Sequence, residues 1–251
     1  MKIKINKVNQ QNFIDFVNKL KVIDSFIYFK IKNGTVEASA YLPQRDAVKH
    51  HKLALKDIFQ IEQDIKTDKE LKIAFFDAAK LTEAFKQFDY DSIQGEIEFI
   101  ENAEDFVATS FRIFNDELEI VLSCSEPSLG YKDLTDSQIQ SIFDISGVNF
   151  SFEIDYTTLS KAKSIFNLDK DDTFSIRPDK NGVRFKGKTY NMLITPDYTG
   201  NTPATPVTLF KKYLNLLDKE DYTANVLDNR VVLKSNDSET LLTIATCQTS
   251  E

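Results

Sequence analysis

Residues 115–124 read Asn-Asp-Glu-Leu-Glu-Ile-Val-Leu-Ser-Cys, and residues 236–247 read Asn-Asp-Ser-Glu-Thr-Leu-Leu-Thr-Ile-Ala-Thr-Cys. Both stretches open on Asn-Asp, continue as an apolar-rich segment typical of a β-strand and close on a cysteine. The second stretch carries two extra residues. This pair of matching ends, one in each half of a 251-residue chain, predicts a tandem duplication.

The order of expected elements repeats as well. Residues 1–124 read as helix, hairpin, helix and β-meander, and residues 148–247 read as helix, hairpin, helix and strand pair. Asn33-Gly34 and Asn181-Gly182 are typical hairpin turns. Four segments place apolar residues with helical spacing, which predicts amphipathic helices that pack one face on a sheet: 12–21, 77–88, 156–167 and 209–217.

These patterns predict an α+β fold made of two similar domains, residues 1–124 and 148–251, with antiparallel sheets on one side and four amphipathic helices lining one face. Asp77 and Asp155 stand where N-caps of two of the helices belong. Residues 125–147 form a connector, in which Thr135 and Gln138 predict a capping box for a short helix through Phe143. A connector of this length is either a functional loop or a plain linker.

Composition narrows the class of protein. The net charge is −8, 41 % of residues are hydrophobic and 28 % are charged, which is typical of a globular protein. Two cysteines make no disulfide framework, so reduced thiols are expected. The sequence shows neither a secretory signal nor an apolar stretch long enough to span a membrane, and we expect a cytoplasmic protein.

Catalytic and metal-binding motifs are missing. The sequence has no glycine-rich phosphate loop and no nucleophile elbow, and Cys124 has no assignable base. Asp169-Lys170-Asp171-Asp172 lacks the glycine and the closing glutamate of a calcium loop. His50 and His51 are adjacent, so they point to opposite faces of a strand, and we expect both at the surface. We predict no enzymatic activity, no cofactor and no metal.

The four helical segments carry an excess of positive charge. They hold three acidic residues and eight lysines, for a net charge of +5 against −13 on the rest of the chain; the lysines are Lys19, Lys21, Lys80, Lys86, Lys161, Lys163, Lys211 and Lys212. Either these lysines form a solvated helix face, or they line a surface that meets DNA. Lysine contacts phosphates as a mobile point charge and reads no base sequence, which suits a protein that slides along DNA.

Several stretches resemble the sliding clamps of DNA replication, the family of proliferating cell nuclear antigen and the T-even phage clamps. Residues 179–185, Asp-Lys-Asn-Gly-Val-Arg-Phe, are similar to a hairpin in the second half of cellular clamps. Residues 206–215, Pro-Val-Thr-Leu-Phe-Lys-Lys-Tyr-Leu-Asn, are similar to a clamp helix that contains the same Tyr-Leu-Asn. Residues 76–88 resemble its counterpart in the first half.

The resemblance implies a ring of six similar domains, built as a homotrimer of two-domain chains, that encircles double-stranded DNA without sequence preference. It places basic residues toward DNA at positions matched by Lys21, Lys86, Lys161, Lys212 and Lys219, whereas Glu83 departs from the family pattern. Together with the helix lysines above, these residues form the predicted DNA-facing set.

The resemblance also implies a groove that docks peptides of the DNA polymerase and the clamp loader. Its expected residues are Tyr41 and Leu42, the connector residues Leu129, Tyr131 and Leu134, and the tail after Thr246. Subunit contacts in the family pair edge strands of neighbouring chains. By that analogy the interface residues are Leu118, Ile120 and Leu122 on one strand and Tyr190, Met192 and Ile194 on the other.

Two other functions remain open from the sequence. One is a monomeric or dimeric polymerase processivity factor that forms no ring, and the other is a non-catalytic viral structural protein of duplicated β domains. Few glycines, prolines and arginines with many lysines, asparagines and isoleucines fit an AT-rich genome, such as that of a phage.

Overall fold

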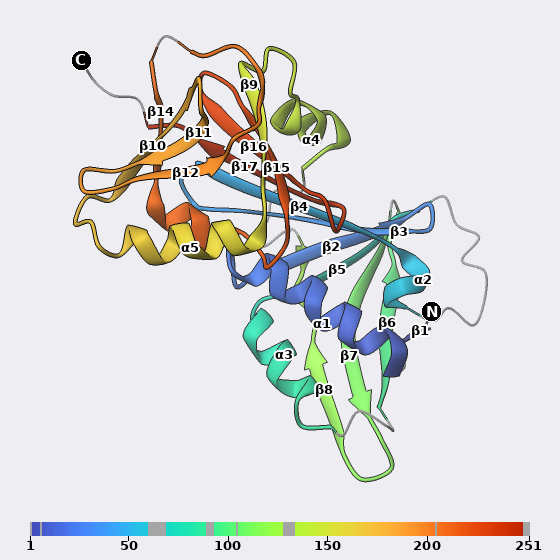
Figure 1. Cartoon of the computed structure of the whole chain (residues 1–251). Coiled ribbons are helices and arrows are strands. Elements are labelled where there is room, and N and C mark those ends of the chain that lie inside the picture. Colours follow the sequence, from blue (N-terminus) through green and yellow to red (C-terminus); the bar gives the residue numbers. More distant parts are fainter. Residues whose placement is uncertain are drawn as a thin grey trace. The chain divides into compact units, whose positions relative to one another are not determined.

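A computed structural model (Figure 1) describes residues 2–5, 7–59, 69–88, 93–103, 105–127, 134–203 and 205–247. The chain divides into two compact units, the first formed by Met1–Ala40 with His50–Leu134 and the second by Tyr41–Lys49 with Thr135–Glu251. The domain boundaries expected from the sequence stay a prediction. No helix in the described part of the chain is long and apolar enough to cross a bilayer.

The first unit contains two groups of neighbouring strands. Antiparallel pairing orders the first group as β1 (Lys2–Ile5), β6 (Gln94–Glu101), β7 (Phe106–Phe114) and β8 (Glu119–Ser123). The second group is β5 (Leu71–Phe75), β2 (Ile27–Lys32) and β3 (Thr35–Tyr41), and β5 joins β7 by a short parallel pairing. The Asn33-Gly34 turn between β2 and β3 is confirmed, since both residues have positive φ, 51° and 74°.

Two helices of the first unit, α1 (Lys7–Lys21) and α3 (Ala78–Phe85), pack against each other (Figure 1). Phe13 of α1 has its ring centroid 5.4 Å from that of Phe85 and 5.8 Å from that of Phe111 in β7. Burial of these aromatic rings is the main stabilising contribution to such a core. Asp77 caps α3 by accepting the N–H groups of Ala79 and Lys80, as predicted. The short helix α2 (Leu55–Ile58) was not expected.

The second unit repeats the strand order of the first. β9 (Phe150–Ile154), β15 (Tyr222–Val226), β16 (Arg230–Ser235) and β17 (Thr240–Ala245) are ordered as β1, β6, β7 and β8 are. In its second sheet, β14 (Val207–Phe210), β10 (Thr173–Asp179) and β11 (Gly182–Lys186) are ordered as β5, β2 and β3 are, followed by β12 (Asn191–Thr195) at the edge. The two-residue β13 (Thr199–Gly200) pairs with β9. The duplicated α+β fold is therefore confirmed.

The helices of the second unit are α4 (Asp136–Phe143), α5 (Tyr156–Phe166) and the 3₁₀ helix η2 (Lys211–Leu216). The capping box of Thr135 and Gln138 and the Asp155 N-cap are both present, as the sequence predicts. The helix expected over 209–217 is shorter, because Leu209 and Phe210 belong to β14 and pair with Phe174 and Thr173 of β10. Burial of Leu209 in this sheet outweighs the helical spacing of its neighbours.

The expectation of surface histidines is wrong. His50 and His51, on β4 (Ala47–Ala54), are both buried. The His51 ring packs 5.3 Å from that of Phe16 in α1, and the His50 Nδ1 lies 2.9 Å from the Ser39 Oγ. The two rings have different recorded neighbours, Ser39 for His50 and Phe16 for His51.

Candidate nucleic-acid interface

The second helix pair, α5 and η2, divides the predicted lysines into exposed and withdrawn groups. Lys161 on α5, Lys212 on η2 and Lys219 just beyond η2 are exposed. The Lys212 Nζ lies over the rings of Tyr213 and Phe210, 4.9 Å and 5.3 Å from their centroids. These three ammonium groups can meet phosphates without first breaking an ion pair that the structure records.

Lys163 and Lys211 were also expected to face DNA, but their ammonium groups bind backbone carbonyls of the protein. The Lys163 Nζ donates to the carbonyl of Leu217 at 3.4 Å, and the Lys211 Nζ donates to the carbonyls of Phe166 and Asp169, each at 3.2 Å. Burial lowers the pKa of Lys163, because a desolvated ammonium is disfavoured, while the nearby Asp218 carboxylate opposes the change. In this structure both ammonium groups are hydrogen-bond donors to the protein's own backbone.

The first helix pair, α1 and α3, carries the other predicted lysines. Lys80 is exposed, and the exposed Lys86 forms an ion pair with Glu83 one turn before it. The Lys21 Nζ donates to the Thr82 Oγ1 at 3.3 Å, and Lys19 is half-buried. Glu83, which departs from the clamp pattern, therefore neutralises one of the basic groups expected to meet DNA.

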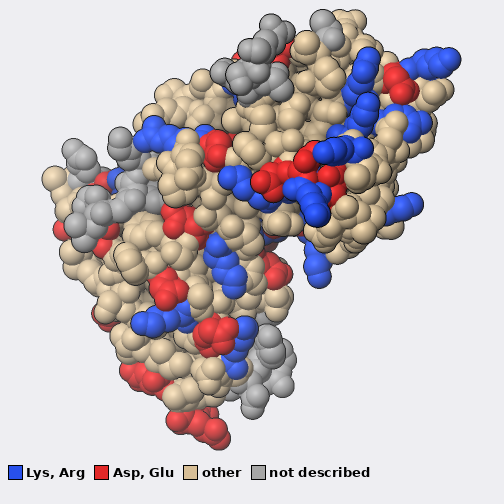
Figure 2. Space-filling model, turned by 90° about the vertical axis from the view of Figure 1, so that its left-hand side faces the viewer, with Lys and Arg blue, Asp and Glu red and all other residues tan. Residues whose placement is uncertain are grey.

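One face of the molecule carries charges of both signs (Figure 2). Figure 2 shows lysine and arginine side chains interleaved with acidic ones on the face it presents, without a broad basic field. An overall charge of −8 agrees with this mixture. The sequence-independent affinity of any protein for DNA rises with the number of phosphates neutralised, and a surface of mixed charge neutralises few of them.

The residues expected in a peptide groove are described in part. Leu129, Tyr131 and the tail after Cys247 lie outside the described residues, and Leu134 belongs to the first unit, where its carbonyl accepts from the Lys30 Nζ at 3.5 Å. In the second unit Tyr41 and Leu42 are half-buried. Tyr41 is the last residue of β3, and Leu42 begins the loop that leads into β4.

Contacts within the second unit hold this loop beside the end of β17. The N–H of Ala245 donates to the Asp46 carbonyl at 2.7 Å, and the Tyr213 hydroxyl donates to the Asp46 carboxylate. The Cys247 N–H donates to the Thr208 carbonyl at 2.8 Å. The Asp46 end of the loop, β14 and the end of β17 thus lie close together.

The two strands expected at subunit contacts are edge strands within the described residues. β8 pairs with β7 and β12 pairs with β11, and no other strand pairing of either is recorded there. Leu118 beside β8 is 40 % exposed and Leu193 on β12 is 41 % exposed. Ile120, Leu122 and Met192 are half-buried, Ile194 is buried, and Tyr190 stacks on Phe166 with 5.1 Å between ring centroids. Exposed apolar edges of this kind are open to pairing with another chain.

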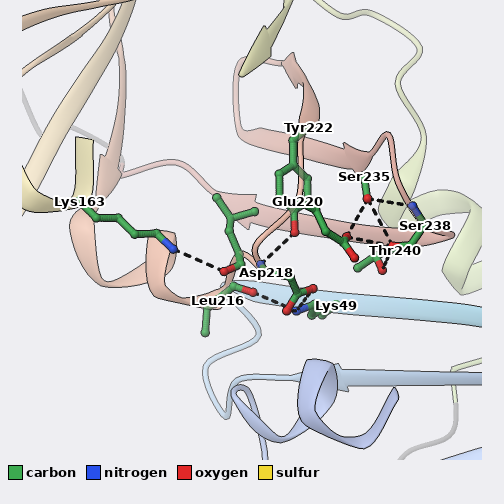
Figure 3. A network of polar contacts seen from close by, with 10 residues as sticks. Lys49, Lys163, Leu216, Asp218, Glu220, Tyr222, Ser235, Ser238 and Thr240 are labelled. Carbon is green, nitrogen blue, oxygen red and sulfur yellow. Dashed lines mark hydrogen bonds and ion pairs between the residues drawn. The ribbon is translucent and has the colours of Figure 1, made fainter. Parts of the chain in front are cut away.

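Sequence reasoning missed a polar network around the end of η2 (Figure 3). The fully buried Lys49 donates to the Leu216 carbonyl at 3.0 Å and to the Asp218 carboxylate at 2.8 Å. The Tyr222 hydroxyl accepts the N–H of Asp218 at 2.9 Å. Lys49 and Asp218 are 169 residues apart, and nothing in the local pattern of either indicates the pairing.

The two cysteines are not activated thiols. Burial raises the pKa of the Cys124 thiol to about 12 and also raises that of Cys247, so neither is an activated thiolate near neutral pH. No three His, Cys, Asp or Glu side chains among the described residues are placed to hold a metal ion.

Solved structures similar to this chain include DNA sliding clamps. The A. fulgidus proliferating cell nuclear antigen (PCNA) bound to the C-terminal region of FEN-1 aligns with all of this chain and 99 % of its own, with a TM-score of 0.68 and 15 % identity. PCNA from Thermococcus kodakaraensis aligns over 98 % of this chain and 99 % of its own, with a TM-score of 0.66 and 14 % identity.

The DNA polymerase III beta chain of Streptococcus pneumoniae gives a TM-score of 0.71 at 13 % identity, and the match spans 99 % of this chain but 65 % of the beta chain. No family profile matches the sequence, and a search of curated proteins finds no relative. The chain therefore has the sliding-clamp fold, recognised through its structure.

Proposed function

We propose that the protein is a DNA sliding clamp, a ring-forming processivity factor that encircles duplex DNA and tethers the replicative DNA polymerase. The observation that carries this proposal is the full-length match to PCNA, in a chain whose two units each pair two lysine-bearing helices. The match covers both duplicated units in one alignment.

The mechanism is topological and electrostatic. A closed ring stays on DNA because the duplex passes through it, so tight binding is unnecessary. Lys80, Lys161, Lys212 and Lys219 are exposed and supply mobile point charges to phosphates. Contacts of this kind carry no sequence information and allow the ring to slide. No chemical step is required of the protein, which agrees with its lack of catalytic motifs.

We further propose a homotrimer closed by the edge strands β8 and β12 of neighbouring chains. Pairing of the two free edges would bury Leu118 and Leu193, which are exposed in the single chain. Three two-domain chains supply the six domains of such a ring. The composition supports a phage or other viral source, with action in the host cytoplasm.

Partner proteins dock, in this proposal, on the surface formed by the 41–46 loop, β14 and the end of β17. The A. fulgidus structure holds a C-terminal region of FEN-1, which shows that this fold accepts a partner segment. For this chain we propose segments of the DNA polymerase and the clamp loader, with Tyr41 and Leu42 among the contacts.

The first test is the solution mass by light scattering after size exclusion over a tenfold dilution series. A species of about three times 28.7 kDa supports the ring. A monomer at every concentration would overturn it and favour a processivity factor that forms no ring.

The second test is DNA-dependent stimulation of a cognate polymerase by a charge-reversal variant. Changing Lys86, Lys161 and Lys212 together to Glu is expected to abolish stimulation, because the helix faces then repel phosphates. The matched control changes three exposed lysines outside the helices to Glu and is expected to retain activity; they are Lys180 in the turn between β10 and β11, Lys186 on β11 and Lys234 on β16. Equal stimulation by both variants would refute the DNA-facing assignment.

A further inference from the structure

One helix of the second pair, η2, is short, and lysine side chains bind the carbonyls at its end and at the end of α5. η2 is a six-residue 3₁₀ helix, and 3₁₀ hydrogen bonds are weaker than those of an α-helix. The last carbonyls of any helix lack partners within the helix, and lysine side chains can supply them. Here three lysines supply such partners, and two of them come from the helix pair itself.

Lys211, the first residue of η2, binds the C-terminal end of α5. Its Nζ donates to the carbonyl of Phe166, the last residue of α5, and to that of Asp169, each at 3.2 Å. Its side chain is 13 % exposed and lies 5.7 Å from the centroid of the Tyr190 ring. The ammonium is therefore surrounded by carbonyls, a carboxylate and aromatic faces, all of which favour a cation.

Lys163, in the last turn of α5, binds the C-terminal end of η2. Its Nζ donates to the carbonyl of Leu217, the residue that follows η2, at 3.4 Å (Figure 3). Lys49 donates to the preceding carbonyl, that of Leu216, at 3.0 Å. A lysine of each helix thus donates to a carbonyl at the C-terminal end of the other helix, Phe166 for α5 and Leu217 for η2.

We infer that Lys163 and Lys211 are positioning residues that cross-cap α5 and η2 and so fix the exposed Lys161 and Lys212 in one arrangement. The sequence carries these as two close couples, Lys161 with Lys163 and Lys211 with Lys212. In each couple one lysine is exposed and the other is turned inward. The capping follows from the structure alone, whereas the purpose of the exposed lysines rests on the proposed function.

Withdrawal of Lys163 or Lys211 to meet a phosphate would remove the side-chain donor from part-buried carbonyls: Leu217 would lose the Lys163 donor, and Phe166 would keep only the N–H of Asp169. An unsatisfied buried polar group is costly, and each lysine would also have to leave its present surroundings. Lys161 and Lys212 meet no such penalty, because no carbonyl accepts from either in the structure. The two lysines of each couple should therefore respond differently to neutralisation.

The test is amide hydrogen exchange of four single variants of the full chain: Lys163→Met, Lys211→Met, Lys161→Met and Lys212→Met. Methionine keeps much of the apolar stem and removes the charge. We expect exchange at residues 214–217 in Lys163→Met, and at residues 167–169 and 211 in Lys211→Met, to be about tenfold faster. Lys161→Met and Lys212→Met are the matched controls and should exchange as the wild type does.

Amides of α1 report whether a variant has lost its fold as a whole, because they belong to the other unit. Lys211→Arg keeps a hydrogen-bond donor at this position and should therefore show slow exchange. If Lys211→Met acted only through a general loss of packing, Lys211→Arg would not show slow exchange. Unchanged exchange at these amides in Lys163→Met and Lys211→Met would overturn the inference. So would equal acceleration in the two controls.

A second measurement separates this inference from the proposed function. The salt dependence of binding to duplex DNA should become shallower in the Lys161 and Lys212 variants, by about 0.9 in the log–log slope for each phosphate that is no longer neutralised. If Lys163→Met and Lys211→Met lower the slope equally, these lysines meet phosphates and the inference fails. If no variant changes the slope while exchange responds as expected, the capping stands and the DNA-facing assignment fails.

Discussion

The ammonium group of Lys49 lies 2.7 Å from the carboxylate of Asp218, and its side chain has no exposed surface. The same ammonium donates to the Leu216 carbonyl. Removing one partner of a buried ion pair leaves the other charge uncompensated. Lys49→Met is therefore expected to lower the free energy of unfolding by about 3 kcal/mol, as measured by urea denaturation.

The matched control is Lys52→Met, an exposed lysine on the same strand, which should change stability by less than about 0.5 kcal/mol. Asp218→Asn combined with Lys49→Met should be less destabilising than the two single effects added, because neither charge is then left alone. Additive losses would show that the pair does not act as a unit.

Asp169 follows α5 and holds the turn between β11 and β12. Its carboxylate accepts the N–H groups of Asp171, Lys188 and Thr189 at 3.1, 2.7 and 3.4 Å. These hydrogen bonds, with the attraction of Lys211, lower the pKa of Asp169 below its ordinary value. Its stabilising contribution is therefore present above an ordinary Asp pKa of about 3.9 and is lost as the pH falls through the lowered value.

Asp169→Asn is accordingly expected to lower the Tm at pH 7, and the gap to the wild type should narrow below about pH 4. Thermal unfolding from pH 7 to pH 3 measures this gap. Asp171→Asn removes one exposed carboxylate from the same loop and is the control for the change in net charge. A gap that stays constant over this range would contradict the ionic role of Asp169.

Local chemistry made much of the fold predictable. The N-caps at Asp77 and Asp155, the capping box at Thr135 and the Asn33-Gly34 turn are each decided by residues within a few positions of one another. The two similar segments that end in cysteine do form equivalent strands, β8 and β17, at the ends of their units. Patterns of this kind can be predicted because the residues that form each feature are close together in the chain.

Long-range packing decided what the sequence did not predict. Leu209 has helical spacing but lies in β14. His50 and His51 are polar but buried, where His50 contacts Ser39 and His51 packs on Phe16. Counting charges on the helices identified the lysines but could not show which side chains are exposed and which turn inward. Lys163 and Lys211 find backbone partners 54 and 45 residues away, and a flexible lysine stem gives no local indication of such a partner.

Tyr213 anchors the 41–46 loop through its hydroxyl, which donates to the Asp46 carboxylate. Burial and this carboxylate raise the pKa of Tyr213, so the hydroxyl stays protonated and able to donate. Tyr213→Phe is expected to lower the free energy of unfolding by about 1–2 kcal/mol, because Asp46 loses its donor in a part-buried place. Urea denaturation measures this loss, with the exposed Tyr156→Phe as the control.

The same change tests the proposed docking surface. Faster amide exchange at residues 42–47 in Tyr213→Phe should accompany weaker binding of a polymerase peptide, since Leu42 belongs to that loop. Leu42→Ala should weaken binding without altering the oligomer. Peptide affinity unaffected by both changes would place the docking surface elsewhere.

If the chains form a ring through β8 and β12, a charge on either edge strand should dissociate the trimer without unfolding the single chain. Leu118→Glu and Leu193→Glu each alter a side chain about 40 % exposed in the single chain, so the Tm of the monomer should change little. In a closed trimer the same carboxylate would be buried in an apolar contact, which is strongly unfavourable. We expect the dissociation constant of the trimer to rise at least about 100-fold, from an interface penalty near 2.7 kcal/mol. Light scattering over a dilution series measures it, with Leu168→Glu, 76 % exposed and off both edges, as the control. An unchanged mass in both edge variants would exclude β8 and β12 as the subunit contact.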